Sequence, residues 1–283
     1  MKLVITTDKL FKLIKKKQKN LRIVDTRTFH EYSIGHIPYA VNIDLMQYHW
    51  NDTSKDGLKT FNVQMRKLLS IIGINPKTLL VFYDNISGPS ASRGVWLSLY
   101  FSHNNVVLLD GGLNTWKKEN KPIETKTENL KYFKMKEKIN DNILADYQNV
   151  IEAIKDKKKH LIIDSRSFKE YSGEHIRAIR EGHIPSALNI DWSENISNDK
   201  FKTATALKKI YSKLPQNQEI ITYCQGGYRA ANTFIILKQL GFKKVKMYLG
   251  SWNEWGNNVR LPIEKDTKKN KKKKFSDNHI KSI

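Results

Sequence analysis

The sequence predicts an α/β protein with two tandem domains, each a mostly parallel β-sheet flanked by helices. The chain has 283 residues, of which 39% are hydrophobic and 28% charged, which is a globular composition. This length favours two domains of about 140 residues, each with a core that needs no disulfide or metal. Two further observations support the prediction: a duplicated sequence and a regular alternation of strand and helix patterns.

The duplication is visible in four separated blocks. The first copy contains RIVDTRTFHEYSIGHIPYAVNID at 22–44, and the second contains LIIDSRSFKEYSGEHIRAIREGHIPSALNID at 161–191. Matching positions lie 139 or 140 residues apart: Asp25 and Asp164, Asp84 and Cys224, Trp116 and Trp255. A shared offset of this kind indicates a duplicated domain.

Within each copy, short apolar runs alternate with helical spacing. Strands are predicted at 21–25, 78–84 and 105–110, and at 160–164, 219–224 and 244–249. Helices are predicted at 8–14, 63–73 and 93–101, and at 147–154, 205–214 and 231–241. Buried strands that alternate with amphipathic helices form parallel sheets covered on both faces. Ligands of such sheets bind where a strand turns into a helix.

The domain limits follow from the repeat and from composition. We place the first domain at 1–118, a linker at 119–143, the second domain at 144–265 and a basic tail at 266–283. The stretch 117–141 is polar and has neither helical nor strand periodicity, so it is expected to be an exposed linker. The tail contains KKNKKKK from Lys268 and is expected to be a solvated, disordered end.

The net charge of +22 and the pI near 9.8 are typical of proteins that bind nucleic acids. The lysines are spread over the whole chain, however, so only the basic tail favours such a partner. The sequence shows neither a signal peptide nor an apolar run of about twenty residues. With a single cysteine, which suits a reducing compartment, we expect a cytoplasmic protein, monomeric and without a membrane partner.

That cysteine, Cys224, lies in YCQGGYRAAN at the end of a predicted strand. Gly226 and Gly227 allow a tight curve with positive φ, whose backbone N–H groups form a concave anion site. The helix that follows from Ala230 adds a partial positive charge, and Arg229 adds a full one. These features favour the thiolate over the thiol. We therefore interpret Cys224 as a nucleophile that handles an anion.

The loop length separates two chemistries. Enzymes of the tyrosine-phosphatase type use Cys-x5-Arg, whereas Cys224 and Arg229 form Cys-x4-Arg, one residue shorter. The smaller ring suits a sulfur atom carried on the cysteine better than a phosphoryl group. A phosphatase or arsenate reductase stays open as the alternative.

The sequence resembles a tandem-domain rhodanese, of the thiosulfate and 3-mercaptopyruvate sulfurtransferase family. The resemblance covers about residues 1–265 and rests on four motifs: the paired Asp-x-Arg, GHIPYA with GHIPSA, the loop CQGGYR and the closing GSWNEW. It implies two rhodanese-like domains, of which the second is catalytic. Asp84 stands where the first copy would need its cysteine, so the first domain is expected to be inactive and to wall one side of the cleft.

The resemblance also implies roles for further residues. Donor sulfur would form a persulfide on Cys224, bound by the loop residues Gln225, Gly226, Gly227, Tyr228 and Arg229 and by the nearby Ser251. Arg177 and Arg180 lie in an insertion at 174–185 and are candidates for binding the donor anion. Asp164, Arg166 and His183 are interpreted as structural support, because Asp25, Arg27 and His36 repeat them. Trp252 and Trp255 are expected in the core.

The loop CQGGYR matches neither of the two best-known subtypes of the family. We favour thiosulfate or another small anionic sulfur donor, with cyanide or a thiol as acceptor, and keep 3-mercaptopyruvate as the alternative. A non-catalytic persulfide carrier or a basic binding protein is the alternative of another class. No cofactor or metal is expected.

Overall fold

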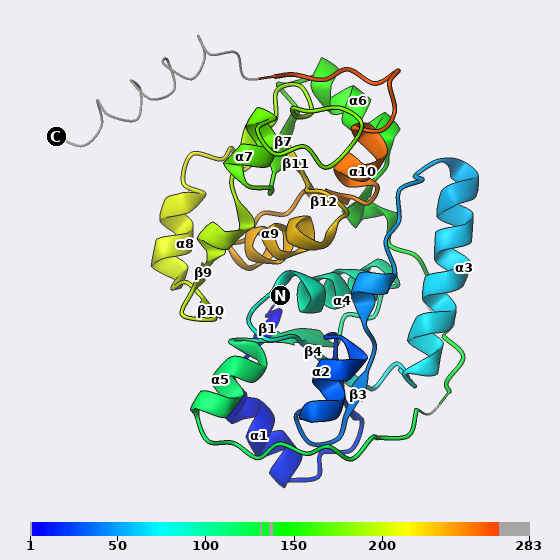
Figure 1. Cartoon of the computed structure of the whole chain (residues 1–283), viewed down its shortest axis with the longest axis vertical. Helices are drawn as coiled ribbons and strands as arrows, with labels where there is room; N and C mark the ends of the chain where they lie inside the picture. Colours follow the sequence, from blue (N-terminus) through cyan, green and yellow to red (C-terminus); the bar gives the residue numbers. More distant parts are fainter. Residues whose placement is uncertain (1, 131, 136–137, 266–283) are drawn as a thin grey trace, which may run out of the picture.

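The structure is a computed structural model that describes residues 2–130, 132–135 and 138–265. It has two α/β domains, one above the other in Figure 1, and each holds a five-stranded parallel sheet flanked by helices. The predicted fold class is therefore confirmed. The basic tail at 266–283 lies outside the described residues.

The first domain has the strand order β1-β5-β4-β2-β3. Its strands are β1 (Val4–Ile5), β2 (Leu21–Asp25), β3 (Ala40–Asn42), β4 (Leu79–Tyr83) and β5 (Val106–Leu109). Its helices are α1 (Thr7–Lys15), α2 (Phe29–Ile34), η1 (Leu45–Gln47), α3 (Lys55–Ile71), α4 (Pro89–Tyr100) and α5 (Gly112–Lys118). Because all strands are parallel, their carboxyl ends lie along one edge of the sheet.

The second domain repeats this order as β6-β12-β11-β7-β8. Its strands are β6 (Leu144–Ala145), β7 (His160–Asp164), β8 (Leu188–Asn189), β11 (Glu219–Tyr223) and β12 (Val245–Tyr248). Its helices are η2 (Asp141–Ile143), α6 (Tyr147–Lys155), α7 (Phe168–Ser172), η3 (Trp192–Asn195), α8 (Ala204–Ile210), α9 (Tyr228–Gln239) and α10 (Ser251–Trp255). The central strand β11 ends immediately before Cys224.

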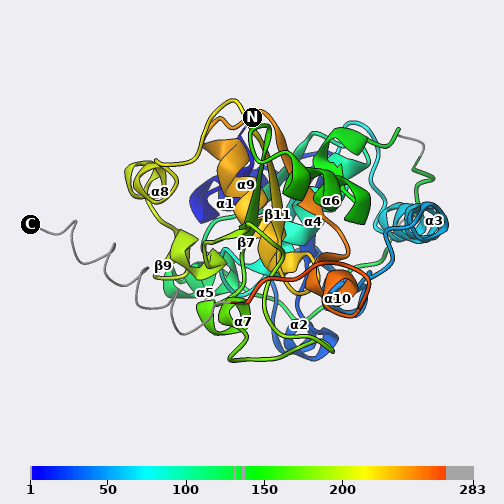
Figure 2. The same ribbon diagram turned by 90° about the horizontal axis from the view of Figure 1, so that it is seen from above.

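The two domains meet through α4 and α9, which lie side by side in both views (Figures 1 and 2). Both helices are buried over nearly their whole length, so neither has the polar face of a surface helix. At this contact Asn232 donates Nδ2 to the Ser87 carbonyl at 2.9 Å and to Ser92 Oγ at 3.0 Å. One hydrophobic core continues through the interface and contains residues of both domains, among them Phe61 and Phe234.

A small hairpin of the second domain reaches the first domain. It consists of β9 (Ile196–Ser197) and β10 (Lys200–Phe201), which pair antiparallel. Between them, Asp199 accepts from Lys118 at 2.7 Å, and its carbonyl accepts from the Ser87 N–H at 2.8 Å. This hairpin adds a further point of attachment between the domains.

The segment between the domains is largely exposed, as expected, but one part of it is not. Met135 is buried in the core, and its N–H donates to Ser70 Oγ at 3.0 Å. The Asn140 N–H likewise donates to the Tyr100 carbonyl at 2.7 Å. The expectation of an exposed linker is therefore wrong at Met135, because this side chain fills space against the end of α3.

Among the described helices, none combines the length and hydrophobicity that crossing a membrane requires.

Candidate active site

A pocket of about 490 Å³ lies between the domains at the carboxyl end of β11. The first domain lines it with Met46, His49, Asp84, Pro89 and Ser90, and the second with Arg177, Trp192, Cys224, Gln225, Gly226, Tyr228, Arg229 and Asn253. The pocket is thus formed where a strand turns into a helix, as expected for a parallel sheet. The first domain forms one wall of it.

Cys224 lies on this pocket and is 1% exposed. The Gly227 N–H donates to its Sγ at 3.1 Å. Gly227 is also the N-cap of α9, so the sulfur lies at the positive end of a twelve-residue helix. Both features stabilise negative charge on sulfur.

The cysteine loop is shorter than the sequence suggested. The helix α9 begins at Tyr228, not at Ala230, so Tyr228 and Arg229 form its first turn. Only one of the two glycines needs left-handed backbone: Gly227 has φ of 84°. Gly226 is required for space instead, because a Cβ there would lie 2.9 Å from Nδ1 of His49 in the first domain.

Helix α10 holds the loop from behind. The Trp252 N–H donates to the Cys224 carbonyl at 2.9 Å, and the Asn253 N–H donates to the Gln225 carbonyl at 2.8 Å. Ser251 accepts the Cys224 N–H on Oγ at 3.2 Å and donates to the Tyr248 carbonyl. Ser251 thus binds the cysteine backbone. Its φ of 52° is unusual for a non-glycine residue.

Arg229 does not present a free guanidinium to the pocket. It donates to both carboxylate oxygens of Glu170, at 2.6 and 2.8 Å. A capping box at the start of α7 orients Glu170, because Ser167 and Glu170 exchange side-chain to backbone hydrogen bonds. Burial opposes ionisation of Glu170, yet the hydrogen bonds and charge of Arg229 lower its pKa to about 2. The charge predicted for the cradle at Arg229 is therefore largely neutralised.

The two candidate arginines of the insertion separate clearly. Arg177 lines the pocket, and its side chain is 48% exposed. Arg180 donates instead to the carbonyls of Trp255, Gly256, Asn258 and Leu261, which lie in and after α10. Since those four bonds occupy its guanidinium outside the pocket lining, the structure gives no support to donor binding by Arg180.

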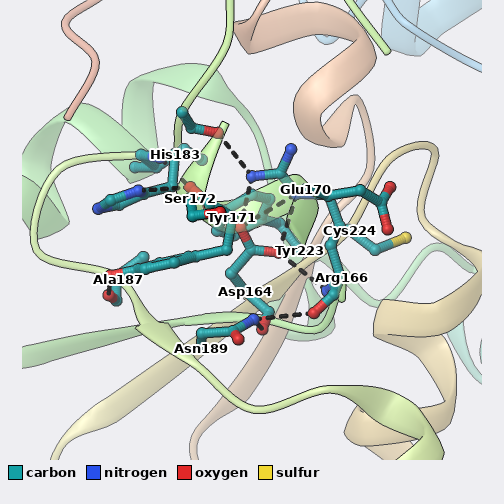
Figure 3. A network of polar contacts seen from close by, with 12 residues as sticks. Asp164, Arg166, Glu170, Tyr171, Ser172, His183, Ala187, Asn189, Tyr223 and Cys224 are labelled. Carbon is teal, nitrogen blue, oxygen red and sulfur yellow. Dashed lines mark hydrogen bonds and ion pairs between the residues drawn. The ribbon is translucent and has the colours of Figure 1, made fainter. Parts of the chain in front are cut away.

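Asp164, Arg166 and His183 belong to a network behind the cysteine (Figure 3). Arg166 donates to Asp164 at 2.6 Å and to the Gly182 carbonyl at 2.9 Å. His183 stacks on Tyr171 with a centroid distance of 3.7 Å. The first copy repeats these contacts: Arg27 bonds Asp25 and the Gly35 carbonyl, and His36 stacks on Tyr32. Among the described residues, this network adds nothing to the pocket lining.

Two further loop residues have defined contacts. Gln225 donates Nε2 to Asn253 Oδ1 at 2.6 Å and to the Arg177 carbonyl at 2.9 Å, which joins the insertion to the loop. The Tyr228 hydroxyl donates to the Leu45 carbonyl in the first domain. Both residues line the pocket, as does Gly226. The loop is therefore tied to both domains.

In the first copy, a carboxylate occupies the place of the sulfur. Asp84 accepts backbone N–H groups of Ile86, Gly88 and Ala91 at 3.1 to 3.2 Å. Burial raises its pKa to about 6 in spite of these bonds. The loop of the first domain thus still supplies backbone N–H donors for an anion, but the carboxylate of Asp84 occupies that site.

A family model described as the rhodanese-like domain matches residues 6–119 and again residues 147–258. The chain belongs to the rhodanese-like domain family. The two matched stretches confirm the tandem arrangement that the repeat predicted. They cover most of the chain.

Curated relatives extend over both rhodanese-like domains. The thiosulfate sulfurtransferase of Corynebacterium glutamicum is 34% identical, over 84% of this chain and 83% of the relative. The sulfur carrier protein TtuD of Thermus thermophilus is 33% identical, over 83% of this chain and 87% of the relative. Among solved structures, SseA of Escherichia coli, described with the 3-mercaptopyruvate sulfotransferases, has a TM-score of 0.75 and 28% identity, covering 89% of this chain and 99% of SseA.

The residues that the sequence did not predict at this rhodanese-like site include His49 and Asn253, which line the pocket, and Arg93 and Glu170, which lie beside the cysteine loop. Glu170 carries a signal, since Glu-Tyr-Ser occurs in both copies, with Glu31 in the first. Asn253 lies in the closing GSWNEW motif, where only the tryptophans and the serine were considered. His49 and Arg93 come from the first domain, and nothing in the sequence indicates that they approach Cys224.

Proposed function

We propose that this protein is a sulfurtransferase that takes sulfane sulfur from thiosulfate onto Cys224 and passes it to cyanide or a thiol. The observation that carries the proposal is the placement of Cys224 Sγ on an interdomain pocket, at the start of α9 and within 3.1 Å of the Gly227 nitrogen. The relatives named thiosulfate sulfurtransferase support thiosulfate as the donor.

Loading would begin with attack of the Cys224 thiolate on the outer sulfur of thiosulfate. A sulfur–sulfur bond forms to Cys224, the sulfur–sulfur bond of thiosulfate breaks, and sulfite leaves with the electron pair. The terminal sulfur of the persulfide then carries the negative charge. The Gly227 N–H and the N-terminus of α9 would stabilise that charge with dipoles already in position.

Transfer would return the enzyme to its starting state. A cyanide ion or a thiolate attacks the terminal sulfur of the persulfide, and the new bond gives thiocyanate or a persulfide of the acceptor. The sulfur–sulfur bond to Cys224 breaks, and Cys224 keeps the electron pair as a thiolate. The reaction is therefore ping-pong and needs no external oxidant or reductant.

Arg177 is the residue that we propose for binding the sulfonate end of the donor. It lines the pocket together with Cys224, and among the described residues its half-exposed guanidinium forms a long contact of 3.5 Å with Glu170. A guanidinium presents a fork of donors to such an oxyanion. Of the two arginines in the insertion, Arg177 is the one in the pocket lining, which favours it over Arg180.

The six-residue loop and the pairing of Arg229 disfavour a phosphatase. Phosphate transfer at a cysteine loop uses the arginine fork to bind the phosphoryl oxygens. Here Glu170 already occupies both ends of the Arg229 fork. Sulfur transfer needs only a stabilised monoanion at the cysteine, which the Gly227 N–H and α9 supply.

Steady-state assays with two sulfur donors and one phosphatase substrate test the proposal. We expect the wild-type protein to form thiocyanate from thiosulfate and cyanide, and Cys224→Ser to form none. With 3-mercaptopyruvate as donor, a lower kcat/KM supports the thiosulfate assignment, and a higher one replaces it with the activity described for SseA. Hydrolysis of p-nitrophenyl phosphate by wild type and not by Cys224→Ser would contradict sulfur transfer.

The compartment and the partners follow from the same chemistry. A catalytic thiol must be reduced, and Cys224 is the only cysteine of the chain, so we propose the cytoplasm. A sulfur carrier protein among the relatives supports a protein thiol as one possible acceptor. If a protein thiol removed the sulfur of the Cys224 persulfide and cyanide did not, a sulfur carrier would be favoured over an enzyme that uses cyanide as acceptor.

A further inference from the structure

One buried charge in the first domain has no acidic partner among the residues that the structure describes. Among the described residues, the buried arginines are Arg27, Arg93 and Arg166. Arg27 and Arg166 bond Asp25 and Asp164, but within residues 2–130, 132–135 and 138–265 no carboxylate forms an ion pair with Arg93. Arg93 lies on α4 and is 3% exposed. A buried unpaired charge is costly, so its counter-charge must be sought nearby.

Arg93 lies directly against the underside of the cysteine loop. Its Nη1 would be 3.1 Å from a Cβ on Gly227, the residue whose N–H donates to Cys224 Sγ. The guanidinium also lies over the rings of Tyr228, at 5.6 Å, and Trp96, at 4.8 Å. These aromatic faces accommodate a cation but do not neutralise it.

The groups around Cys224 leave Arg93 as the uncompensated cation on the buried side of the loop. Arg229 is paired with Glu170, and Asp84 is held by N–H groups of its own loop. Burial raises the pKa of Tyr228 to about 12, so its phenol is neutral. Burial and two nearby arginines lower the pKa of His49, so it is neutral too. Arg177 is half-exposed on the solvent side of the pocket.

Cys224 is then the remaining group that can supply the negative charge. Burial lowers the pKa of Arg93, and the ionised forms of Tyr228 and Cys224 act in the opposite direction. An arginine stays protonated even so. The thiolate of Cys224 and the guanidinium of Arg93 would therefore stabilise each other across the loop.

We propose that Arg93 is the counter-cation of the Cys224 thiolate and of its persulfide, so that the first domain supplies charge to the reaction although it has no nucleophile. This proposal rests on the sulfurtransferase function proposed above. Arg93 does not line the pocket and touches no substrate; it is a positioning residue that acts through Cys224. It gives the first domain a physical role at the reactive thiol of the second.

The test compares Arg93→Met and Arg93→Lys, with Arg66→Met as the matched control. Arg66 lies on α3 of the same domain, with its guanidinium over Phe101 at 4.9 Å. The titration of Cys224 is followed by the ultraviolet absorbance of the thiolate and by its alkylation rate as a function of pH. Persulfide formation from thiosulfate is measured at neutral pH on the same proteins.

We expect Arg93→Met to move the thiol titration to higher pH by about one unit, and to lower the rate of persulfide formation at neutral pH by up to about tenfold, because less of Cys224 is then thiolate. The KM for thiosulfate should change little, Arg93→Lys should restore most of the rate, and Arg66→Met should leave the titration of Cys224 unchanged. If Arg93→Met does not fold, Arg93→Gln replaces it as the uncharged variant.

An unchanged titration of Cys224 in the folded, uncharged variant would overturn the role of Arg93. That readout needs no sulfur donor, so it is independent of the proposed activity. Wild-type protein that takes no sulfur from thiosulfate would instead overturn the proposed function, whatever the titration shows.

Discussion

The guanidinium of Arg229 is bound at both ends by the carboxylate of Glu170, at 2.6 and 2.8 Å. This pair joins the first turn of α9 to α7 and fixes the end of the cysteine loop. The arginine that ends the loop therefore holds the loop in shape, while the Gly227 N–H contacts the sulfur.

Replacing Glu170 with alanine should destabilise the fold as well as the loop. It leaves the Arg229 guanidinium largely buried and without its partner, which costs about 3 kcal/mol in the free energy of unfolding. Glu31→Ala is the matched control in the first copy, where the partly exposed carboxylate accepts from Asn85 instead. We expect it to cost less than about 1 kcal/mol. Denaturant unfolding measures both; equal losses would contradict a special role for the Glu170 pair.

Arg177 and Arg180 should differ in kind. Arg177→Met is expected to raise the KM for thiosulfate about tenfold with little change in kcat, because it removes a charge-assisted bond to the donor. Arg180→Met should lower the unfolding midpoint and leave the KM unchanged, since Arg180 binds four carbonyls around α10. Steady-state kinetics and thermal unfolding on the same proteins separate the two. A KM effect confined to Arg180→Met would reverse the assignment.

Two glycines with positive φ allow the effect of backbone strain to be distinguished from the effect of a Cβ that contacts the site. Gly227 and Gly241 have φ of 84° and 94°, so alanine at either position costs about 1 kcal/mol of stability. A Cβ at Gly241 meets nothing within 4 Å, whereas one at Gly227 approaches Arg93 and the Leu249 carbonyl. We expect Gly241→Ala to keep full activity and Gly227→Ala to lose most of it. Equal activities would show that the loop tolerates this shift.

The buried carboxyl of Asp84 should make stability depend on pH. Burial raises its pKa from 3.8 to about 6, so the folded state binds this proton more tightly than the unfolded state. The stabilising contribution is fully present below about pH 4 and is lost as the pH rises through about 6, a change of about 3 kcal/mol. Asp84→Asn should lack this decline. The comparison is the unfolding free energy of the two proteins from pH 4 to 7, and parallel curves would contradict the account.

Much of the fold could be predicted because the domain sequence occurs twice and many of its strands and helices show periodic patterns of apolar residues. The six central strands and the amphipathic helices such as α1 and α6 have clear periodicity, and the structure contains them. The edge strands β1, β6 and β8 have only two residues each, too few to show any periodicity. They form because a parallel neighbour supplies their hydrogen bonds, which is tertiary information.

The residues of the site likewise divide into those that the local sequence predicts and those that only tertiary contacts bring together. Cys224 and its glycines were recognisable because local loop chemistry determines what they do. The pairing of Arg229 with Glu170 was not predicted, since 59 residues separate them in sequence. His49 and Arg93 reach the loop only because α4 and α9 pack across the domain interface. The resemblance predicts that the first domain forms a wall of the cleft, but the residues with which it approaches the loop follow only from the packing of the two domains.

The intact mass of the protein after incubation with thiosulfate tests the central claim most directly. We expect wild type to gain the mass of one sulfur atom, to lose it again when cyanide is added, and to release an equal amount of thiocyanate. Cys224→Ser should gain nothing. A wild-type protein that never gains sulfur, or a Cys224→Ser variant that gains as much as wild type, would contradict sulfur transfer through Cys224.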